Sequence, residues 1–415
     1  MEIRKIPGGV TAAIGFSAAS CMAGIKYQDR TDMAMIFSDA PCTSAGTFTR
    51  NVVKAAPVLW DREIVKSAGP VRAVVVNSGI ANAGTGAEGM HICEKTAEAV
   101  QARLGIPTRS VLLGSTGVIG MQIPLDRIGK GVGLLADGLG HSLEKGTEAS
   151  RAIMTTDTVN KETAVRIELP AAEGSGVVPV TIGGMSKGSG MIHPNMCTML
   201  AYITTDCAIE KSLLQKLVSG IVADTFNMIS VDGDTSTNDT LLVLANGMAG
   251  NEPIREEDES CRAFAGALLA VCRELAMKMA ADGEGATTLI ESTVVHMDTK
   301  ENARILARSV VSSSLVKAMV FGKDANCGRI LCALGYAGPS FDPELTEIRM
   351  SGENGEVIFC KDGAVLPFDE ALALRILSED KVRFLSDMHM GEESATAWGC
   401  DLTYDYVKIN GDYRT

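Results

Sequence analysis

The segment KGSGMIHPNMCTMLAYITTD, residues 187–206, constrains the fold and the chemistry of this chain more than any other part. A polar, glycine-rich approach ends at Pro194, and a β-branched, apolar run begins at Thr198. This pattern predicts an irregular loop that becomes a strand at Thr198. A threonine hydroxyl at such a junction is typical of N-terminal-nucleophile enzymes. In those enzymes the chain cuts itself before the threonine, and the new α-amino group serves as the base.

The self-cleavage hypothesis assigns a role to both residues of the Cys197–Thr198 peptide bond. The Thr198 hydroxyl oxygen would attack the carbonyl carbon of Cys197, the resulting ester would hydrolyse, and two chains would separate. The freed α-amine has a reference pKa of about 7.7–8.0, so near neutral pH it can accept the proton of its own hydroxyl. No histidine is needed, which suits a chain with only five of them.

Cys197 is the rival nucleophile, because a thiolate is intrinsically more reactive and His193 lies four residues earlier. Cleavage would then fall before Cys197 or would not occur. A Cys–His pair requires proximity in space and not in sequence, so the sequence leaves this alternative open.

Length and composition exclude several classes of protein. A chain of 415 residues with 46% apolar and 21% charged residues is an ordinary soluble globular protein of one large α/β unit or two to three domains. Only 4% of the residues are aromatic and the net charge is −13, which argues against nucleic-acid binding. No apolar stretch approaches the roughly 20 residues of a membrane span, and no signal peptide is evident. We therefore expect a cytoplasmic protein with no membrane partner.

Metal and nucleotide motifs are also unconvincing. The eleven cysteines form no C-x-x-C pair, which favours free, buried thiols over a zinc ribbon or a disulfide framework. The acidic run at 232–240 lacks the glycine and the bidentate glutamate of a calcium loop. The glycine clusters at 129–133 and 322–324 lack the Ser/Thr that follows a phosphate-loop lysine. We expect no metal and no cofactor.

Hydrophobic periodicity predicts interleaved strands and helices. Strands are expected at 72–76, 110–113, 178–182, 198–204, 241–244 and 288–297. Helices are expected near 89–104, 124–154 with a glycine-rich break, 209–226, 259–280 and 303–320, and the tail from 344 to 415 reads as mostly β. Short turns between neighbouring strands favour antiparallel pairing. The predicted fold class is α/β, a layered sandwich with mixed and antiparallel sheets and outer helices, similar to N-terminal-nucleophile enzymes.

The turn Gly114-Ser115-Thr116-Gly117 directly follows a predicted strand. It is either a plain turn or an oxyanion hole, in which the Gly117 backbone N–H and the Thr116 hydroxyl point at a tetrahedral oxygen.

Seven runs in the same order resemble one family over the whole chain, the glutamate N-acetyltransferases (ornithine acetyltransferases) of arginine biosynthesis. The runs are VNSGIANAGTG at 76–86, STGVIG at 115–120, TTDT at 155–158, KGSGMIHPNMCTML at 187–200, DGDTSTNDT at 232–240, DGEGAT at 282–287 and WGCDLTYDYVKINGDYRT at 398–415. The resemblance implies cleavage between Cys197 and Thr198 into an α chain, 1–197, and a β chain, 198–415, that begins with the nucleophile. It also implies that Thr116 and Gly117 form the oxyanion hole.

The resemblance further implies a set of substrate-binding residues: Thr155, Lys187, Thr198, Glu284, Asn410 and Thr415. Lys187 can pair with a substrate carboxylate and Glu284 with an ammonium group. The implied reaction is ping-pong transfer of acetyl from N2-acetyl-L-ornithine to L-glutamate through an acetyl ester on Thr198. It needs no cofactor, and acetyl-CoA remains open as a second donor. The α and β chains are expected to pair as a heterotetramer.

Two positions depart from the family pattern. Where this chain has Cys197 the family usually has alanine, and this difference puts the cleavage rate in question. Where this chain has Cys327 the family usually has tryptophan. Loss of an indole would enlarge a pocket or loosen the packing near Arg329. The sequence leaves two other functions open: a self-cleaving aminopeptidase or amidohydrolase whose acyl-enzyme is hydrolysed by water, and an uncleaved, non-enzymatic binding protein.

Overall fold

The computed structural model describes residues 2–67, 69–193 and 199–412. Contacts divide the chain into two compact units. Unit 1 comprises Met1–Gly188, Pro194–Ala223 and Thr235–Leu275, and unit 2 comprises Ser189–His193, Asp224–Asp234 and Ala276–Thr415. The expected α chain, 1–197, and β chain, 198–415, are defined by a cut in the backbone, and they do not coincide with the two compact units. The cut itself stays a prediction.

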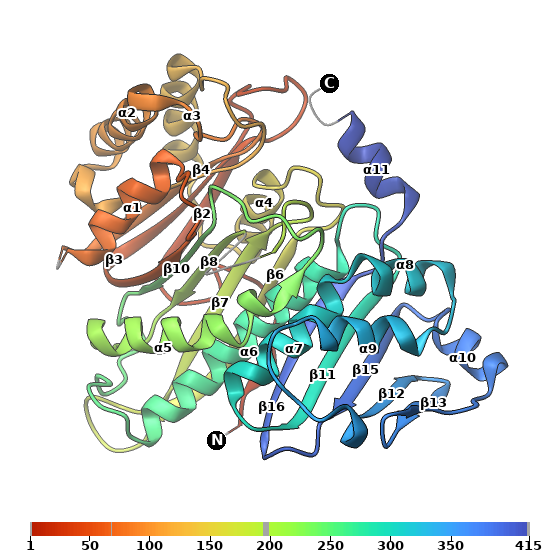
Figure 1. Cartoon of the computed structure of the whole chain (residues 1–415). Coiled ribbons are helices and arrows are strands. Elements are labelled where there is room, and N and C mark those ends of the chain that lie inside the picture. The colour runs from red at the N-terminus through yellow and green to blue at the C-terminus, as the bar shows by residue number, and fades with distance from the viewer. Residues whose placement is uncertain (1, 68, 194–198, 413–415) are drawn as a thin grey trace. The chain divides into compact units, whose positions relative to one another are not determined.

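A nine-stranded mixed sheet forms the centre of unit 1 (Figure 1). Its order is β1-β6-β7-β8-β10-β3-β4-β5, with β2 paired to β3. The strands are β1 (Arg4–Ile6), β2 (Phe16–Cys21), β3 (Met33–Phe48), β4 (Val71–Asn77), β5 (Val111–Ser115), β6 (Lys161–Pro170), β7 (Val177–Lys187), β8 (Leu200–Thr205) and β10 (Thr240–Ala245). The pairs β4–β5 and β8–β10 are parallel and the others antiparallel, so the predicted mixed α/β class is confirmed.

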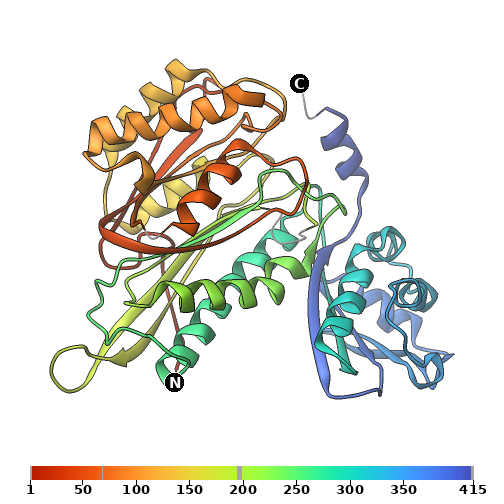
Figure 2. The same ribbon diagram turned by 60° about the vertical axis from the view of Figure 1, so that its left-hand side comes forward.

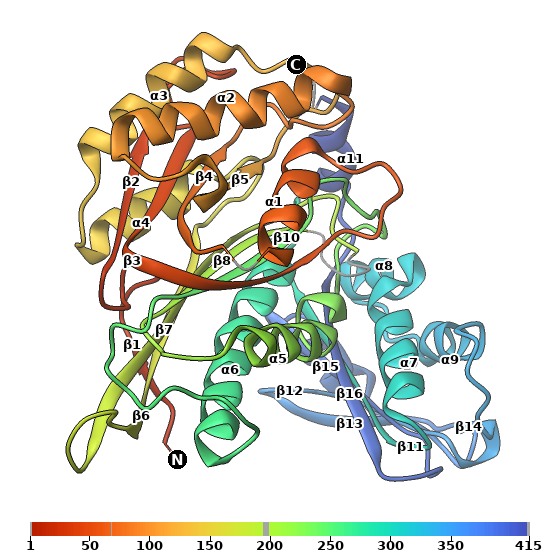
Figure 3. The ribbon, with the colours of Figure 1, turned by 90° about the vertical axis from the view of Figure 1, so that its left-hand side faces the viewer.

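The long strand β3 joins the two halves of this sheet. Its first part pairs with β2 and β4, its last part pairs with β10, and the register shifts between Phe37 and Cys42. Figure 3 shows it as a long curved ribbon. The sheet curls enough for the fully buried Tyr202 of β8 to pack on Gly114 of β5, where an added Cβ would lie 1.9 Å from the Tyr202 hydroxyl.

Amphipathic helices cover this sheet. They are α1 (Ala56–Lys66), α2 (Gly86–Leu104), α3 (Leu125–Gly138), α4 (Leu143–Ala152), α5 (Lys211–Ala223) and the first part of α6 (Glu259–Ala281), with a short 3₁₀ turn, η1 (Thr108–Ser110). The first four pack on the β2–β5 half of the sheet, and α5 packs along β3 (Figure 3). The buried side chains are mostly Val, Ile, Leu, Ala and Met, because the chain has few aromatic residues to fill the core.

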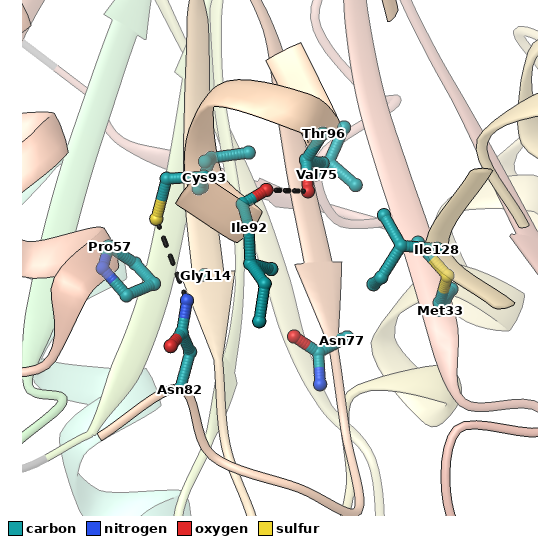
Figure 4. A pocket seen from close by; sticks show the side chains of 11 residues that line it. Met33, Pro57, Val75, Asn77, Asn82, Ile92, Cys93, Thr96, Gly114 and Ile128 are labelled. Atoms are coloured by element: carbon teal, nitrogen blue, oxygen red, sulfur yellow. Dashed lines mark hydrogen bonds between the residues drawn. The ribbon is translucent and has the colours of Figure 1, made fainter. Parts of the chain in front are cut away.

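A cavity of about 20 Å³ lies between this sheet and helices α2 and α3 (Figure 4). Its polar neighbours already have partners: the Thr96 hydroxyl donates to the Ile92 carbonyl at 2.7 Å, and the Asn82 amide donates to the Cys93 sulfur at 3.6 Å. This volume is about that of one water molecule. We interpret the cavity as imperfect packing and not as a ligand site.

Unit 2 is built on a seven-stranded sheet in the order β14-β13-β12-β15-β11-β16-β9. Its strands are β9 (Ile229–Ser230), β11 (Leu289–Met297), β12 (Glu347–Gly352), β13 (Gly355–Lys361), β14 (Ala364–Val365), β15 (Lys381–Asp387) and β16 (Glu393–Cys400). Its helices are α7 (Lys300–Ser312), α8 (Ser314–Gly322), α9 (Cys327–Gly335), α10 (Glu370–Ile376) and α11 (Tyr404–Gly411), with 3₁₀ turns η2 (Phe226–Met228) and η3 (Pro343–Leu345). Helix α7 packs against β11 and β16 (Figure 2).

Several sequence predictions need correction. The helix expected at 303–320 is two helices, because the Ser313 hydroxyl accepts a hydrogen bond from the Val316 N–H and starts a new helix there. The tail expected to be mostly β also contains α10 and α11, which are capped by Asp369 and Thr403. The hydrophobic periodicity did not predict α1 and α9. The region expected to be helical at 124–154 contains the two helices α3 and α4, and the first residue of the strand expected at 198–204 lies outside the described residues. The other predicted strands and helices are confirmed, with ends shifted by a few residues.

The ten described cysteines form no disulfide with one another, and nine of them are buried, in line with the buried thiols that the sequence predicted.

By length and hydropathy, none of the described helices could cross a membrane by itself, whereas the bent pair of α7 and α8 passes this test on length and composition alone.

Asp61, on α1, is a charged residue in the core of unit 1. It is fully buried, and its Oδ1 accepts a hydrogen bond from the Leu113 N–H at 2.8 Å. Within the described part of the chain its Oδ2 has no hydrogen-bond partner. Burial raises the pKa of this carboxyl well above its usual range, and the Leu113 bond offsets only part of that effect.

We expect Asp61→Asn to gain stability relative to the wild type as the pH rises from about 5 to about 8. The pKa of Asp61 is higher in the folded than in the unfolded chain. The folded state therefore holds this proton more tightly, and the wild type loses up to about 1.4 kcal/mol per pH unit above the unfolded-state pKa. Asparagine does not titrate. Urea unfolding at several pH values measures the effect, with exposed Asp29→Asn as the control. A constant difference between variant and wild type would contradict it.

Candidate active site

A buried charge cluster joins two of the predicted substrate residues. Asp157 lies between α4 and β6, and Lys187 is the last residue of β7. The Asp157 Oδ1 accepts hydrogen bonds from the Lys161 ammonium at 2.7 Å and from the Gly188 N–H at 2.8 Å. Its Oδ2 lies 3.7 Å from the Lys187 Nζ and accepts a hydrogen bond from the Thr155 N–H at 3.1 Å. Asp157 therefore positions Thr155 and Lys187 together.

The Asp157 carboxylate stays ionised in spite of its burial. Desolvation by itself would raise its pKa, but the positive charges of Lys187 and Lys161 and the hydrogen bonds lower the pKa below its usual range. Because the folded pKa is lower than the unfolded one, the cluster stabilises the fold above the unfolded pKa, and this contribution is lost as the pH falls. Asp157 stands inside the TTDT run, but no local pattern in the sequence marks it as a site residue.

Thr155 and Asp157 also line an open pocket of about 560 Å³ in unit 1. Arg30 and Arg151 line the same pocket, and the Arg30 guanidinium donates a hydrogen bond to the Met154 carbonyl. Two guanidinium groups beside a threonine hydroxyl suit a small anionic group such as a carboxylate.

The predicted oxyanion turn, Thr116-Gly117, follows β5. It is held by two backbone bonds, from the Thr116 N–H to the Asn77 carbonyl at 3.0 Å and from the Val118 N–H to the Gly79 carbonyl at 3.1 Å. Gly117 has φ +125°, and an added Cβ would lie 2.3 Å from the Gly79 carbonyl, so only glycine fits. Among the described residues, neither the Gly117 N–H nor the Thr116 hydroxyl has a hydrogen-bond partner. Both donors of the expected oxyanion hole are thus available.

Asp239, in the DGDTSTNDT run, contacts Met199, which follows the predicted nucleophile in the sequence. Its buried carboxyl interacts with the N–H of Met199, the residue after Thr198, and with the hydroxyls of Ser236 and Thr49. Burial raises its pKa well above the usual range, and the nearby Lys187 charge opposes this rise. The Thr240 N–H donates to the Met199 carbonyl at 2.8 Å. These contacts hold the start of β8 in place.

Asp232, at the other end of the same run, holds the chain before the predicted cleavage point. Its carboxylate accepts hydrogen bonds from the Met191 N–H at 2.6 Å and the Ile192 N–H at 2.9 Å. The Tyr406 hydroxyl of α11 also donates to it, at 3.3 Å. The run 232–240 therefore carries two carboxyls. One contacts residues 191–192, before 194–198, and the other contacts Met199, after them.

Unit 2 brings together two further predicted substrate residues, Glu284 and Asn410. The Asn410 side-chain amide, on α11, donates to the Glu284 Oε2 at 2.7 Å. The Glu284 N–H donates to the Ser189 carbonyl at 3.0 Å, and its side chain is buried. An added Cβ at Gly190 would lie 2.3 Å from the Glu284 carboxylate. One glycine of the KGSG run is thus needed to make room for this carboxylate.

Thr198, Cys197 and Thr415 lie outside the described residues, so their predicted roles stay predictions. At the second departure from the family pattern, Cys327 is buried at the start of α9. Arg329 nearby donates a hydrogen bond to the Leu315 carbonyl at 2.9 Å.

Comparison with known proteins identifies the family. A family model described as "ArgJ family" matches residues 17–415. The "Arginine biosynthesis bifunctional protein ArgJ" of Symbiobacterium thermophilum is 50% identical over 412 residues, which cover 99% of this chain and 99% of that protein. The protein of the same name from Thermotoga neapolitana is 46% identical over 97% of this chain and 99% of its own length.

The chain belongs to the ArgJ family. It is thereby an acyltransferase enzyme of arginine biosynthesis, and the resemblance inferred from seven sequence runs is confirmed. Among solved structures, an ArgJ protein of Bacillus halodurans is 42% identical, covers 51% of this chain and 97% of its own, and has a TM-score of 0.49. The ornithine acetyltransferase of Mycobacterium tuberculosis, complexed with ornithine, is 41% identical, covers 47% of this chain and 99% of its own, and has a TM-score of 0.42.

We expect Gly117→Ala to lower acyl-transfer activity by about 100-fold or more, because the new Cβ must displace the Gly79 backbone and the donor with it. Gly120→Ala is the matched control. Gly120 also has a positive φ, +84°, but no atom within 4 Å of the added Cβ. It should cost about 1–2 kcal/mol of stability and leave the rate per folded enzyme unchanged. Equal activity loss in the two variants would contradict this role for Gly117.

We expect Asp157→Asn to destabilise the folded protein by about 3–5 kcal/mol, because it removes the negative charge that two buried ammonium groups contact. The control is Asp126→Asn, which removes an exposed ion pair with Arg127 at 3.8 Å and should cost no more than about 1 kcal/mol. Urea unfolding measures both. Similar small losses in the two variants would show that the cluster does not hold this part of unit 1 together.

Proposed function

We propose that this ArgJ-family enzyme transfers the acetyl group of N2-acetyl-L-ornithine to L-glutamate through an acetyl ester on Thr198. The observation that carries the proposal is the pair of available donors at Thr116 and Gly117, on a turn that tolerates no side chain at Gly117. Acyl transfer passes through a tetrahedral oxyanion, and two such donors stabilise it.

In the first half-reaction the Thr198 Oγ attacks the acetyl carbonyl carbon, and the α-amine of Thr198 takes the hydroxyl proton. The oxyanion accepts hydrogen bonds from Thr116 and Gly117. When it collapses, the carbon–nitrogen bond breaks and the ammonium returns its proton to the leaving amine of ornithine. In the second half-reaction the α-amine of glutamate attacks the ester carbon. The Thr198 oxygen leaves, regains a proton, and N-acetylglutamate is released.

Oppositely charged side chains support an amino-acid substrate. Lys187, positioned with Thr155 by Asp157, would pair with the substrate carboxylate. Glu284, held by Asn410, would pair with the ammonium group. The resemblance adds Thr415 to this set. The proposal requires no cofactor, and acetyl-CoA would serve, if at all, as a second acetyl donor.

Formation of the nucleophile requires cleavage between Cys197 and Thr198. Asp232 and Asp239 support it, because they anchor residues 191–192 and Met199 on the two sides of that bond. An anchored flank on each side favours one reactive geometry for the peptide between them. The α and β chains would remain associated, as a heterotetramer in the cytoplasm.

The rival pair of Cys197 and His193 has less support. The His193 Nδ1 lies 3.0 Å from the Ser230 hydroxyl oxygen, and burial and the nearby Arg308 charge lower the pKa of His193 to about 4. An imidazole with so low a pKa is a weak base near neutral pH and does not favour a thiolate–imidazolium pair. We therefore assign the nucleophile to Thr198.

We expect the wild type to give two chains on a denaturing gel. One should contain residues 1–197, and the other should begin with the sequence Thr-Met-Leu-Ala. Thr198→Ala should run as one chain near 43.6 kDa and transfer no acetyl group, because it has no oxygen to form the ester. Thr198→Ser keeps the oxygen and should retain cleavage. A cleaved, active Thr198→Ala protein would refute the proposal.

Analysis of the products formed from N-acetylornithine identifies the donor and the acceptor of the acetyl group. N-acetylglutamate formed in proportion to ornithine supports transfer, whereas free acetate formed regardless of glutamate would favour the amidohydrolase alternative. Replacing N-acetylornithine by acetyl-CoA tests the second donor.

A further inference from the structure

Two connections meet at one end of the unit 2 sheet, outside the site described above. Strands β11 and β15 are parallel neighbours, with Val295 paired to Asp387, so their carboxyl ends reach the same edge. His296 is the residue before the end of β11, Asp387 ends β15, and His389 follows two residues later. Two of the chain's five histidines thus lie beside one carboxylate.

The donor atoms of these three side chains converge. The His296 Nδ1 lies 2.8 Å from the Asp387 Oδ1 and 2.9 Å from its Oδ2. The His389 Nδ1 lies 3.4 Å from the same Oδ1, and all three ligand atoms fall within 4.8 Å of one another. For metal–ligand bonds of about 2.0–2.2 Å and ligand–metal–ligand angles of about 90–109°, neighbouring ligand atoms lie about 2.8–3.6 Å apart, which matches both His–Asp separations.

The backbone commits both histidines to this arrangement. His296 and His389 have φ +53° and +52°, a left-handed conformation that costs free energy in a residue other than glycine. The conformation is held by hydrogen bonds from the Met390 N–H to the His296 carbonyl at 2.7 Å and from the His389 N–H to the Asp387 Oδ1 at 3.1 Å. The two imidazole rings are nearly parallel, at 18°, with centroids 6.1 Å apart. One histidine would suffice for an ion pair with Asp387, so the second points to a further ligand.

We propose that His296, Asp387 and His389 bind one divalent transition-metal ion, of which Zn²⁺ is the representative. Two imidazole nitrogens and one carboxylate oxygen suit Zn²⁺, Ni²⁺ or Co²⁺, whereas Mg²⁺ and Ca²⁺ prefer oxygen ligands. The side chains of His296 and His389 are 55% and 50% exposed, so solvent can fill the remaining coordination positions. The ion links the β11–α7 and β15–β16 connections and stabilises unit 2. This role is independent of acetyl transfer.

The test is a calorimetric titration of the full, untagged protein with ZnCl₂, and with MgCl₂ as the comparison cation. We expect one Zn²⁺ per chain with micromolar affinity and no binding of Mg²⁺. His389→Gln should weaken Zn²⁺ binding at least tenfold. His91→Gln, which removes an exposed histidine on α2, is the matched control and should bind like the wild type. Equal binding by His389→Gln and the wild type, or no Zn²⁺ binding by the wild type, would overturn the proposal.

Asp387→Asn provides a second measurement that does not alter either histidine. Saturating Zn²⁺ should raise the thermal unfolding midpoint of the wild type and of His91→Gln, and should leave that of Asp387→Asn unchanged. The same upward shift in Asp387→Asn would show that the ion binds elsewhere and would also overturn the proposal.

Discussion

The placement of the substrate residues in unit 1 depends on one buried carboxylate, Asp157. It contacts two buried ammonium groups, Lys161 and Lys187, and the backbone of Thr155 and Gly188. Burying three charges is unfavourable unless each is paired and hydrogen-bonded, and this geometry meets both conditions. Asp157 therefore fixes the ammonium groups of Lys161 and Lys187 and the backbone of Thr155 in one arrangement.

A second constraint acts on the chain around the predicted cleavage bond. The carboxyls of Asp232 and Asp239 are seven residues apart in sequence, yet one contacts residues 191–192 and the other contacts Met199. Burial raises the pKa of both carboxyls. The polar run 232–240 looks suited to binding a cation, but its carboxyls instead hold the backbone of residues 191–192 and Met199. Its hydroxyl residues satisfy its own turns, as in the hydrogen bonds from the Asn238 N–H to the Ser236 hydroxyl at 3.1 Å and from the Thr240 hydroxyl to the Asn238 carbonyl at 3.0 Å.

Features that depend on residues close together in the sequence could be predicted, whereas features that depend on contacts between distant residues could not. Continuous β-branched runs such as 72–76 identify their strands, because burial on both faces leaves a local pattern. The break at Ser313 was missed because a capping hydroxyl inside an apolar, periodic stretch leaves the period unchanged. Glu284 and Asn410 are 126 positions apart and were paired only through family resemblance. Asp157 was overlooked because nothing local shows that its charge faces Lys187. His296 and His389 converge only because β11 and β15 are parallel neighbours, which the sequence pattern did not predict.

The contact between Tyr202 and Gly114 gives the curled sheet of unit 1 a mechanical role. Tyr202 stands on β8, the strand that follows Thr198, and Gly114 stands on β5, the strand that leads into the Thr116-Gly117 turn. One phenol ring therefore spans the interior between the strand that follows the predicted nucleophile and the strand that precedes the predicted oxyanion donors, and the absence of a side chain at Gly114 allows the two strands to approach closely. A larger or smaller side chain at position 202 would change the spacing of these strands without altering any predicted catalytic residue, so substitutions in this part of the core are expected to affect catalysis as well as folding.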